Sequence, residues 1–240
     1  FIRSLPFKLT NDQLNAISEI NKDLNKKKPM MRLLQGDVGC GKTLVALCAM
    51  LQVVESGQQA VLMVPTEVLA KQHYETFKKF LKDKNIKPVL ILGKSKSRSE
   101  NSNNEIDKIK FGKSNLIIGT HAVISNNLQY KNLKLAIIDE QHRFGVNQRI
   151  AIVDKGKNVN LLVMTATPIP RSLALTSYGD LEVTNLKEKP FGRKKIKTST
   201  ISNKKLNNLI EALKRKIDKG SKVYWICPSI EESEDNNIIS

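Results

Sequence analysis

The residues between Gln35 and Thr43 have the types and the spacing that bind a phosphate chain. The sequence QGDVGCGKT places four variable residues between Gly36 and the run Gly41-Lys42-Thr43. Glycines let successive backbone N–H groups curl around a phosphate, and the start of the following helix adds partial positive charge. The Lys42 ammonium suits the β and γ phosphates of ATP, and the Thr43 hydroxyl can coordinate Mg²⁺. The predicted nucleotide contacts in this loop are Gly36, Asp37, Val38, Gly39, Cys40, Gly41, Lys42 and Thr43.

Two adjacent acids, Asp139 and Glu140, follow the predicted strand 133–138, which ends in four apolar residues, and are candidates for the second half of the same site. We expect Asp139 to hold Mg²⁺. We expect Glu140 to orient and deprotonate the attacking water, a role worth about 10²–10⁴ in rate. Adjacent acids after a strand are also common at helix starts. Their pairing with an upstream phosphate loop favours the catalytic interpretation.

Further polar and aromatic residues could complete a nucleotide site. Phe7 could stack on a base and Gln13 could bind an adenine edge, although Phe7 is also suited to a core and Gln13 to a surface. His142 could couple the phosphate site to Thr165 and Thr167, or it could be a structural histidine. Thr167 could equally be a helix N-cap, with Pro168 at the first helical position.

The elements that must position these residues alternate between helices and short apolar strands. Thr10 is a plausible N-cap for a first helix, and a second helix follows the phosphate loop as far as Glu55. A third helix is expected after Pro65-Thr66-Glu67, and the polar stretch 93–105 is expected to be a loop. Buried strands are predicted at 60–64, 88–92, 116–119, 133–138 and 161–164. This order predicts a doubly wound, mostly parallel α/β domain, in which ligands bind beyond the carboxyl ends of the strands.

The domain organisation follows from a change in composition near the carboxyl end. We predict one domain over 1–186, a charged linker over 187–196 (KEKPFGRKKI), and the truncated beginning of a second α/β domain over 197–240. Strands at 197–201 and 223–227, with a helix between them, would begin that second domain. About forty residues cannot bury a core of their own. The chain starts with Phe1, and we expect it to be a piece of a longer protein.

Composition narrows the possible partners. The net charge of +17 and the pI near 9.8 favour a polyanion such as nucleic acid, although a general bias toward Lys would look the same. No apolar stretch has the length of a membrane span, so we expect no membrane partner. The three cysteines show no metal-ligand spacing and are expected to be reduced thiols of a cytoplasmic protein.

Five segments together resemble superfamily 2 helicases. They are GDVGCGKT, VPTEVLAKQH, GTHAVI, DEQHRFGVNQR and TATPIPRSLALTSYGDLEV, in that order. The forms DEQHRFG and TPIPRSLALTSYGDL are most similar to the RecG-type branch-migration DNA helicases. The transcription-repair coupling factor is the neighbouring family, but there we expect a second acid at the position of Gln141. The resemblance implies a RecA-like ATPase domain of a double-stranded DNA translocase that remodels stalled forks and Holliday junctions.

The resemblance also implies roles for individual residues. Phe7 and Gln13 match the adenine-binding motif, and Thr165 to Thr167 match the motif that links hydrolysis to DNA movement. Thr66, at a helix start, could donate hydrogen bonds to a DNA phosphate or could be a simple helix cap. Residues in motifs that face the DNA backbone are Pro65, Thr66, Glu67, Gly119, Thr120 and His121.

The family's wedge domain and most of its second motor domain lie outside these 240 residues. We therefore expect residues 1–240 alone to bind nucleotide weakly, to unwind DNA negligibly, and to belong to a monomeric enzyme that uses ATP and Mg²⁺ on double-stranded and branched DNA. Two other hypotheses stay open, a DNA-binding module with a vestigial ATPase and a small-molecule kinase. Intact Lys42, Asp139 and Glu140 argue against the first, and the helicase motif order argues against the second.

Overall fold

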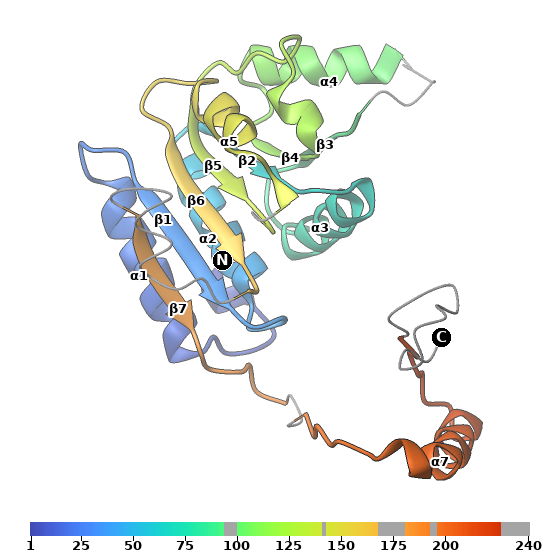
Figure 1. Cartoon of the computed structure of the whole chain (residues 1–240). Coiled ribbons are helices and arrows are strands. Elements are labelled where there is room, and N and C mark those ends of the chain that lie inside the picture. Colours follow the sequence, from blue (N-terminus) through green and yellow to red (C-terminus); the bar gives the residue numbers. More distant parts are fainter. Residues whose placement is uncertain (94–99, 141–142, 168–180, 193–195, 227–240) are drawn as a thin grey trace. The chain divides into compact units, whose positions relative to one another are not determined.

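The computed structural model describes the chain except for residues 94–99, 141–142, 168–180, 193–195 and 227–240, and it leaves out the side chains of 100–103 (Figure 1). The chain divides into two compact units, Phe1–Arg193 and Lys194–Ser240. The candidate site residues all belong to the first unit. No helix in the described part of the chain is both long and apolar enough to cross a membrane.

The first unit is built on a parallel sheet with the strand order β3-β4-β2-β5-β6-β1-β7. Each pairing between neighbouring strands is parallel. The predicted α/β class with a doubly wound parallel sheet is confirmed. The strands are β1 (Met31–Gly36), β2 (Gln59–Met63), β3 (Pro88–Ile91), β4 (Leu116–Gly119), β5 (Leu133–Ile138), β6 (Asn160–Thr165) and β7 (Glu182–Leu186).

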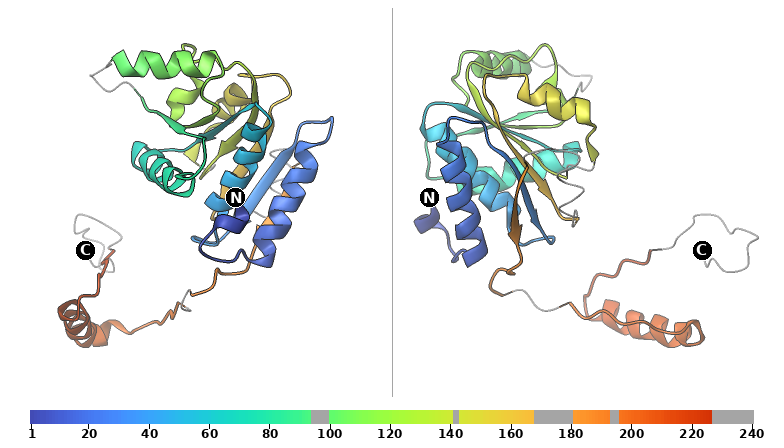
Figure 2. Two further views of the ribbon diagram at one scale, coloured as in Figure 1. Left: turned by 180° about the vertical axis from the view of Figure 1, so that it is seen from behind. Right: turned by 60° about the vertical axis from the view of Figure 1, so that its left-hand side comes forward.

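Helices cover both faces of the sheet (Figure 2). Side chains alternate along the strands, so that Leu34 and Leu62 pack on one face while Leu33 and Val61 pack on the other. The first face is covered by α1 (Asn11–Leu24), α2 (Lys42–Glu55) and α3 (Glu67–Phe80). The second face is covered by α4 (Glu100–Lys110), α5 (Val146–Val153) and the 3₁₀ helix η2 (His121–Ile124).

Helix α1 begins at the predicted N-cap. Thr10 accepts the Gln13 N–H at 3.2 Å, and the Gln13 side chain accepts the Thr10 N–H at 3.0 Å, which forms a capping box. The amino terminus before it contains a short 3₁₀ helix, η1 (Ile2–Ser4). Because Gln13 is the third helical residue, this cap also fixes the direction of a side chain that was predicted to bind nucleotide.

Arg32 ties α1 to the two strands beside it. This buried side chain donates to Asp23 at 2.8 Å and to Thr184 at 2.6 Å, and it pairs with Glu19 at 2.9 Å. A buried guanidinium is tolerated because several acceptors satisfy it. The network joins α1, β1 and β7, and so it supports the strand from which the phosphate loop leaves.

Two details of the first unit differ from the prediction. The stretch 93–105 was predicted to be a loop, but α4 begins at Glu100. The buried Ile109, with the partly buried Ile106, packs this helix on the sheet, and such packing stabilises helices whose own propensity is low. The edge strand β7 was not predicted, because its sequence EVTNL mixes polar and apolar residues.

The second unit also departs from the prediction. Its helix is confirmed as α7 (Leu206–Asp218), preceded by η4 (Asn203–Lys205). The strands predicted at 197–201 and 223–227 were wrong for the described residues, since 197–202 and 221–226 have no regular secondary structure. A strand forms only when a neighbouring strand satisfies its backbone groups, and the described part of this unit offers none.

Candidate functional site

The phosphate loop connects the end of β1 to the start of α2, as predicted. Gly39 has φ 73° and Gly41 has φ 93°, conformations in which a side chain is strained. A Cβ added to Gly36 would lie 2.8 Å from the carbonyl oxygen of Leu186. The loop therefore needs glycine at these three positions, two for their backbone angles and one for its contact with β7.

Lys42 lies against the loop itself. Its Nζ donates to the carbonyl oxygen of Gly36 at 2.6 Å and to that of Asp37 at 3.2 Å. Both acceptors are neutral carbonyl groups, and the partial positive charge at the amino end of α2 also favours an anion. Within the same loop, Asp37 accepts the Val38 N–H at 2.7 Å, and Val38 is exposed.

Cys40 and Gln13 attach the phosphate loop to the rest of the domain. Cys40 is buried among the core residues of α1 and α2, so its side chain points away from the loop's exterior. Gln13 is only 3% exposed, and its Nε2 donates to the Cys40 carbonyl at 2.7 Å. The alternative of a surface glutamine is therefore wrong, and the side chain links the cap of α1 to the phosphate loop.

A cavity of about 720 Å³ brings the predicted aromatic and amide residues together with the phosphate loop. Phe7 is 47% exposed there and contacts Phe80 edge to face, with ring centroids 6.4 Å apart. The surface of the cavity is largely apolar, which suits a nucleotide base. The lining residues are Pro6, Phe7, Lys8, Gln13, Gly41, Thr43, Leu44, Thr76, Phe80, Pro190 and Phe191.

Residues of the predicted linker form one wall of this cavity. Asp12 accepts the N–H groups of Lys187 and Glu188 at 2.7 and 2.8 Å. These hydrogen bonds lower the pKa of the Asp12 carboxyl. They hold the chain beside α1, so that Pro190 and Phe191 reach the cavity that Gln13 lines. Pro190 and Phe191 were not among the predicted site residues.

Asp139 directly follows β5, and each of its two carboxylate oxygens has a contact that orients the group. Oδ1 accepts the Glu140 N–H at 3.0 Å, and Oδ2 lies 3.1 Å from Nε2 of His73. The Asp139 N–H donates to Met63 at 3.0 Å, so the residue is also fixed to β2. Glu140 has φ 51°, a left-handed conformation that is costly for a residue with a side chain and is found at functional sites.

His73 was not predicted as a site residue. It lies in the segment VPTEVLAKQH on α3, where its spacing indicated only a helix. It is 8% exposed and contacts Asp139, which is far away in the sequence. Histidines are few in this chain, and this rarity was the one feature that could have drawn attention to His73. It did not indicate which residue His73 contacts.

The two predicted coupling threonines lie together at the end of β6. The hydroxyl groups of Thr165 and Thr167 are 2.8 Å apart, and the Thr167 N–H donates to Thr165 at 3.1 Å. Thr165 pairs in register with Gln35, the residue that opens the phosphate loop segment. His142 and Gln141 lie outside the described residues, as does Pro168.

The predicted DNA-facing residues gather at the carboxyl ends of β2, β3 and β4. Thr66 caps α3 by accepting the Leu69 N–H at 3.3 Å, and Pro65 and Glu67 flank it. Glu67 and His121 both approach Gly93, since a Cβ there would lie 3.9 Å from Glu67 and 3.5 Å from His121. Thr120 is buried, and its hydroxyl has no hydrogen-bond partner in the described part of the chain.

The residues present fit ATP and Mg²⁺. The loop offers N–H groups and a lysine to phosphate, and the cavity offers an aromatic ring and an amide to a base. Thr43 and Asp139 supply oxygen atoms, the ligand type that Mg²⁺ prefers. The described residues hold no group of three or more His, Cys, Asp or Glu side chains suited to a metal. Mg²⁺ usually takes one or two protein ligands, with phosphates and waters completing its shell, so this set fits it.

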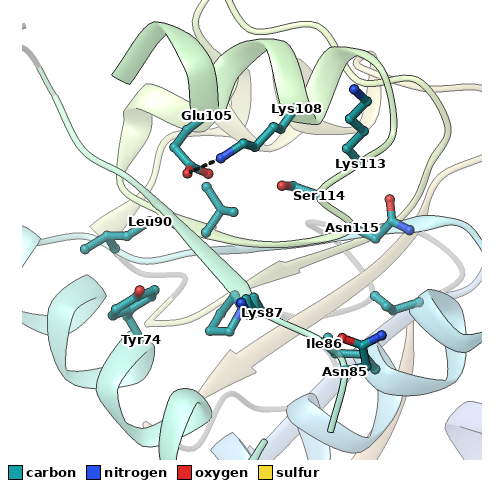
Figure 3. Close-up of a pocket in the computed structure, with 13 residues that line it drawn as sticks. Tyr74, Asn85, Ile86, Lys87, Leu90, Glu105, Lys108, Lys113, Ser114 and Asn115 are labelled. Carbon is teal, nitrogen blue, oxygen red and sulfur yellow. Dashed lines mark hydrogen bonds and ion pairs between the residues drawn. The ribbon is translucent and has the colours of Figure 1, made fainter. Parts of the chain in front are cut away.

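A second cavity, of about 780 Å³, lies at the opposite edge of the sheet, beside the amino ends of β3 and β4 (Figure 3). It is lined by lysines and by Glu105, which pairs with Lys108 at 3.1 Å. None of the predicted site residues lines it. Of the predicted site residues, Phe7, Gln13, Gly41 and Thr43 line the cavity beside the phosphate loop instead.

Comparison with known proteins identifies the class. Residues 10–176 match the family described as DEAD/DEAH box helicase. Because the match covers more than half of the chain, the chain belongs to the DEAD/DEAH box helicase family. Membership of this family implies nucleotide binding.

Within that class, the chain is similar to RecG, as its motifs predicted. It is 48% identical to the ATP-dependent DNA helicase RecG of Thermotoga maritima over 248 residues, which cover 100% of this chain and 30% of that protein. It is also 48% identical to RecG of Streptococcus pneumoniae over 231 residues, which cover 96% of this chain and 34% of that protein. The chain thus spans about a third of the length of these relatives.

A solved structure of RecG bound to a three-way DNA junction matches with a TM-score of 0.80 and 44% identity, covering 91% of this chain and 29% of that chain. The helicase MrfA bound to DNA matches with a TM-score of 0.61 and 21% identity, which shows the fold alone. The predicted RecA-like α/β fold is therefore confirmed.

Proposed function

We propose that the chain is the ATP-binding lobe of a DNA translocase or helicase that acts on double-stranded DNA and remodels branches such as stalled forks and Holliday junctions. The observation that carries the proposal is the cavity that joins Phe7 and Gln13 to the phosphate loop. The similarity to RecG supports the choice of branched DNA, since a RecG relative has been solved on a three-way junction.

In this proposal the adenine base lies in the cavity beside the phosphate loop. The half-exposed ring of Phe7 offers a stacking surface. Gln13 makes one hydrogen bond with each polar atom of its amide, and both atoms have further bonding capacity. An adenine edge presents a donor beside an acceptor, which an amide can match.

The proposed chemistry is hydrolysis of the γ-phosphate. Lys42 exchanges its carbonyl partners for phosphate oxygens, and the loop N–H groups contact the remaining oxygens. Bound Mg²⁺ would neutralise phosphate charge, and Thr43 and Asp139 would hold it. Glu140 orients the attacking water and accepts its proton.

The proposed DNA surface lies at the carboxyl ends of β2, β3 and β4. The first turn of α3, with Pro65, Thr66 and Glu67, and the segment Thr120-His121 would contact the backbone and not the bases. The net charge of +17 supports attraction to a polyanion. Thr165 and Thr167 would couple DNA contact to ATP hydrolysis, because β6 lies beside β1, the strand that leads into the phosphate loop.

We further propose that the working enzyme is a monomer whose remaining parts, a wedge domain and a second motor domain, belong to the same polypeptide. The second motor domain would supply an arginine finger, which is worth about 10³–10⁵ in rate in comparable enzymes. Residues 1–240 alone would therefore turn over ATP slowly.

DNA-stimulated phosphate release by the full-length protein tests the proposal. Wild type should release phosphate faster with a branched duplex than without it, and Lys42→Ala should abolish the stimulated rate. Equal rates for wild type and Lys42→Ala would reject the enzyme and favour a DNA-binding module with a vestigial ATPase. Stimulation by linear duplex equal to that by a junction would reject the branch preference.

A further inference from the structure

The contact between His73 and Asp139 is the strongest feature that the proposed mechanism does not use. Nε2 of His73 lies 3.1 Å from Oδ2 of Asp139, and the two residues are 8% and 9% exposed. An ionised carboxylate can only accept hydrogen bonds, so His73 donates its Nε2 proton to it. A bond between buried groups is shielded from water, and it fixes both side chains.

Each partner in this contact is itself held in place. The His73 ring packs against Phe77 with centroids 6.2 Å apart, and both residues lie on the buried face of α3. The second oxygen of Asp139 accepts the Glu140 N–H at 3.0 Å. The carboxylate therefore has two fixed donors, one from its own turn and one from helix α3, which Thr66 caps.

We propose that His73 is a positioning residue for the Asp139 carboxylate and determines how tightly the site takes Mg²⁺ with a nucleotide. The inference rests on the proposed function, because it assigns Asp139 to the metal. His73 does not contact the metal. Its N–H occupies one side of Oδ2 and so limits the directions in which the carboxylate can offer a lone pair.

Donors that orient a ligating carboxylate typically contribute 10–100-fold to metal affinity or activity. Loss of the His73 donor should therefore raise the Mg²⁺ concentration needed for nucleotide binding by about tenfold. Binding of nucleotide without metal depends on the loop and the base cavity, so it should stay constant. A purely structural role for His73 predicts the opposite pattern, in which both kinds of binding weaken together.

The experiment compares His73→Gln with His73→Asn in the full-length protein. Both variants carry a neutral amide, but only glutamine is long enough to place its N–H near the former Nε2 position. Glu75→Gln, on the exposed face of the same helix, is the control. The measurement is binding of a fluorescent, non-hydrolysable ATP analogue during a Mg²⁺ titration and, separately, in EDTA, with circular dichroism to compare folding.

The expected result is half-saturation by Mg²⁺ close to wild type in His73→Gln and Glu75→Gln, and about tenfold higher in His73→Asn. The inference is overturned if His73→Asn matches wild type, or if it weakens binding in EDTA as much as in Mg²⁺. If wild type itself binds the analogue but ignores Mg²⁺, Asp139 loses its metal role and both proposals fail. A normal Mg²⁺ response in all variants removes only the inference about His73.

Discussion

Replacement of Gly41 by alanine tests how α1 supports the phosphate loop. Gly41 has φ 93°, so any side chain there is strained by roughly 1–2 kcal/mol. The new Cβ would also lie 2.2 Å from Nε2 of Gln13, which is too close for any real contact. Gln13 must move, and its bond to the Cys40 carbonyl, worth about 0.5–1.5 kcal/mol, is lost. The free energy of unfolding should fall by about 1.5–3.5 kcal/mol in total.

Gly57→Ala is the matched control, because Gly57 has φ 76° and no atom within 4 Å of an added Cβ. It follows the end of α2, whereas Gly41 precedes its start. Gly57→Ala should cost only the roughly 1–2 kcal/mol of backbone strain. Urea denaturation followed by circular dichroism measures both variants, and nucleotide affinity should fall in Gly41→Ala alone. Equal destabilisation by the two changes would refute the packing of Gln13 on Gly41.

Three further predictions concern catalysis, acid stability and DNA binding. Glu140→Gln should keep ATP binding in the full-length enzyme but lower turnover by about 10²–10⁴; unchanged turnover would remove Glu140 from the role of base. Burial tends to raise the pKa of Asp23, but hydrogen bonds from Lys26 and Arg32 outweigh it and leave the pKa lowered. These bonds contribute their full stability above about pH 4, and the contribution is lost as the pH falls toward the lowered pKa. The free energy of unfolding of Asp23→Asn should therefore depend less on pH below about pH 4 than that of wild type. Identical acid unfolding of the two proteins would contradict this. Affinity for duplex DNA should fall steeply with salt, because phosphate contacts release counterions, and a flat response would mean that the charge of +17 is only compositional.

Local sequence patterns were enough to locate the phosphate loop and its elements. Gly36, Lys42 and Thr43 are close together in the chain, and the strand before them and the helix after them have clear periodicity. The same holds for Asp139, which follows a strand whose last four residues are apolar. Parallel strands with polar residues at their carboxyl ends also predicted the edge of the sheet at which the candidate site residues lie.

Contacts between distant segments could not be predicted in this way. Nothing in the periodicity of α3 indicates that His73 meets Asp139, and nothing near Asp12 indicates that it holds the backbone at Lys187 and Glu188. These contacts depend on strand order, which brings β2 beside β5 and β1 beside β7. Strand β7 itself was not predicted, because an edge strand needs fewer apolar residues than a central one.

The most direct test of the central claim is a crystal structure of the full-length protein with Mg²⁺ and a non-hydrolysable ATP analogue. We predict the triphosphate on the N–H groups of Gly39 to Thr43, with Lys42 on the β and γ phosphates. We predict that Mg²⁺ lies between the Thr43 hydroxyl and the Asp139 carboxylate, and that the base lies between Phe7 and Gln13. An ordered nucleotide bound elsewhere, or a metal that Asp139 does not approach, would contradict the assignment of this lobe as an ATP-driven motor.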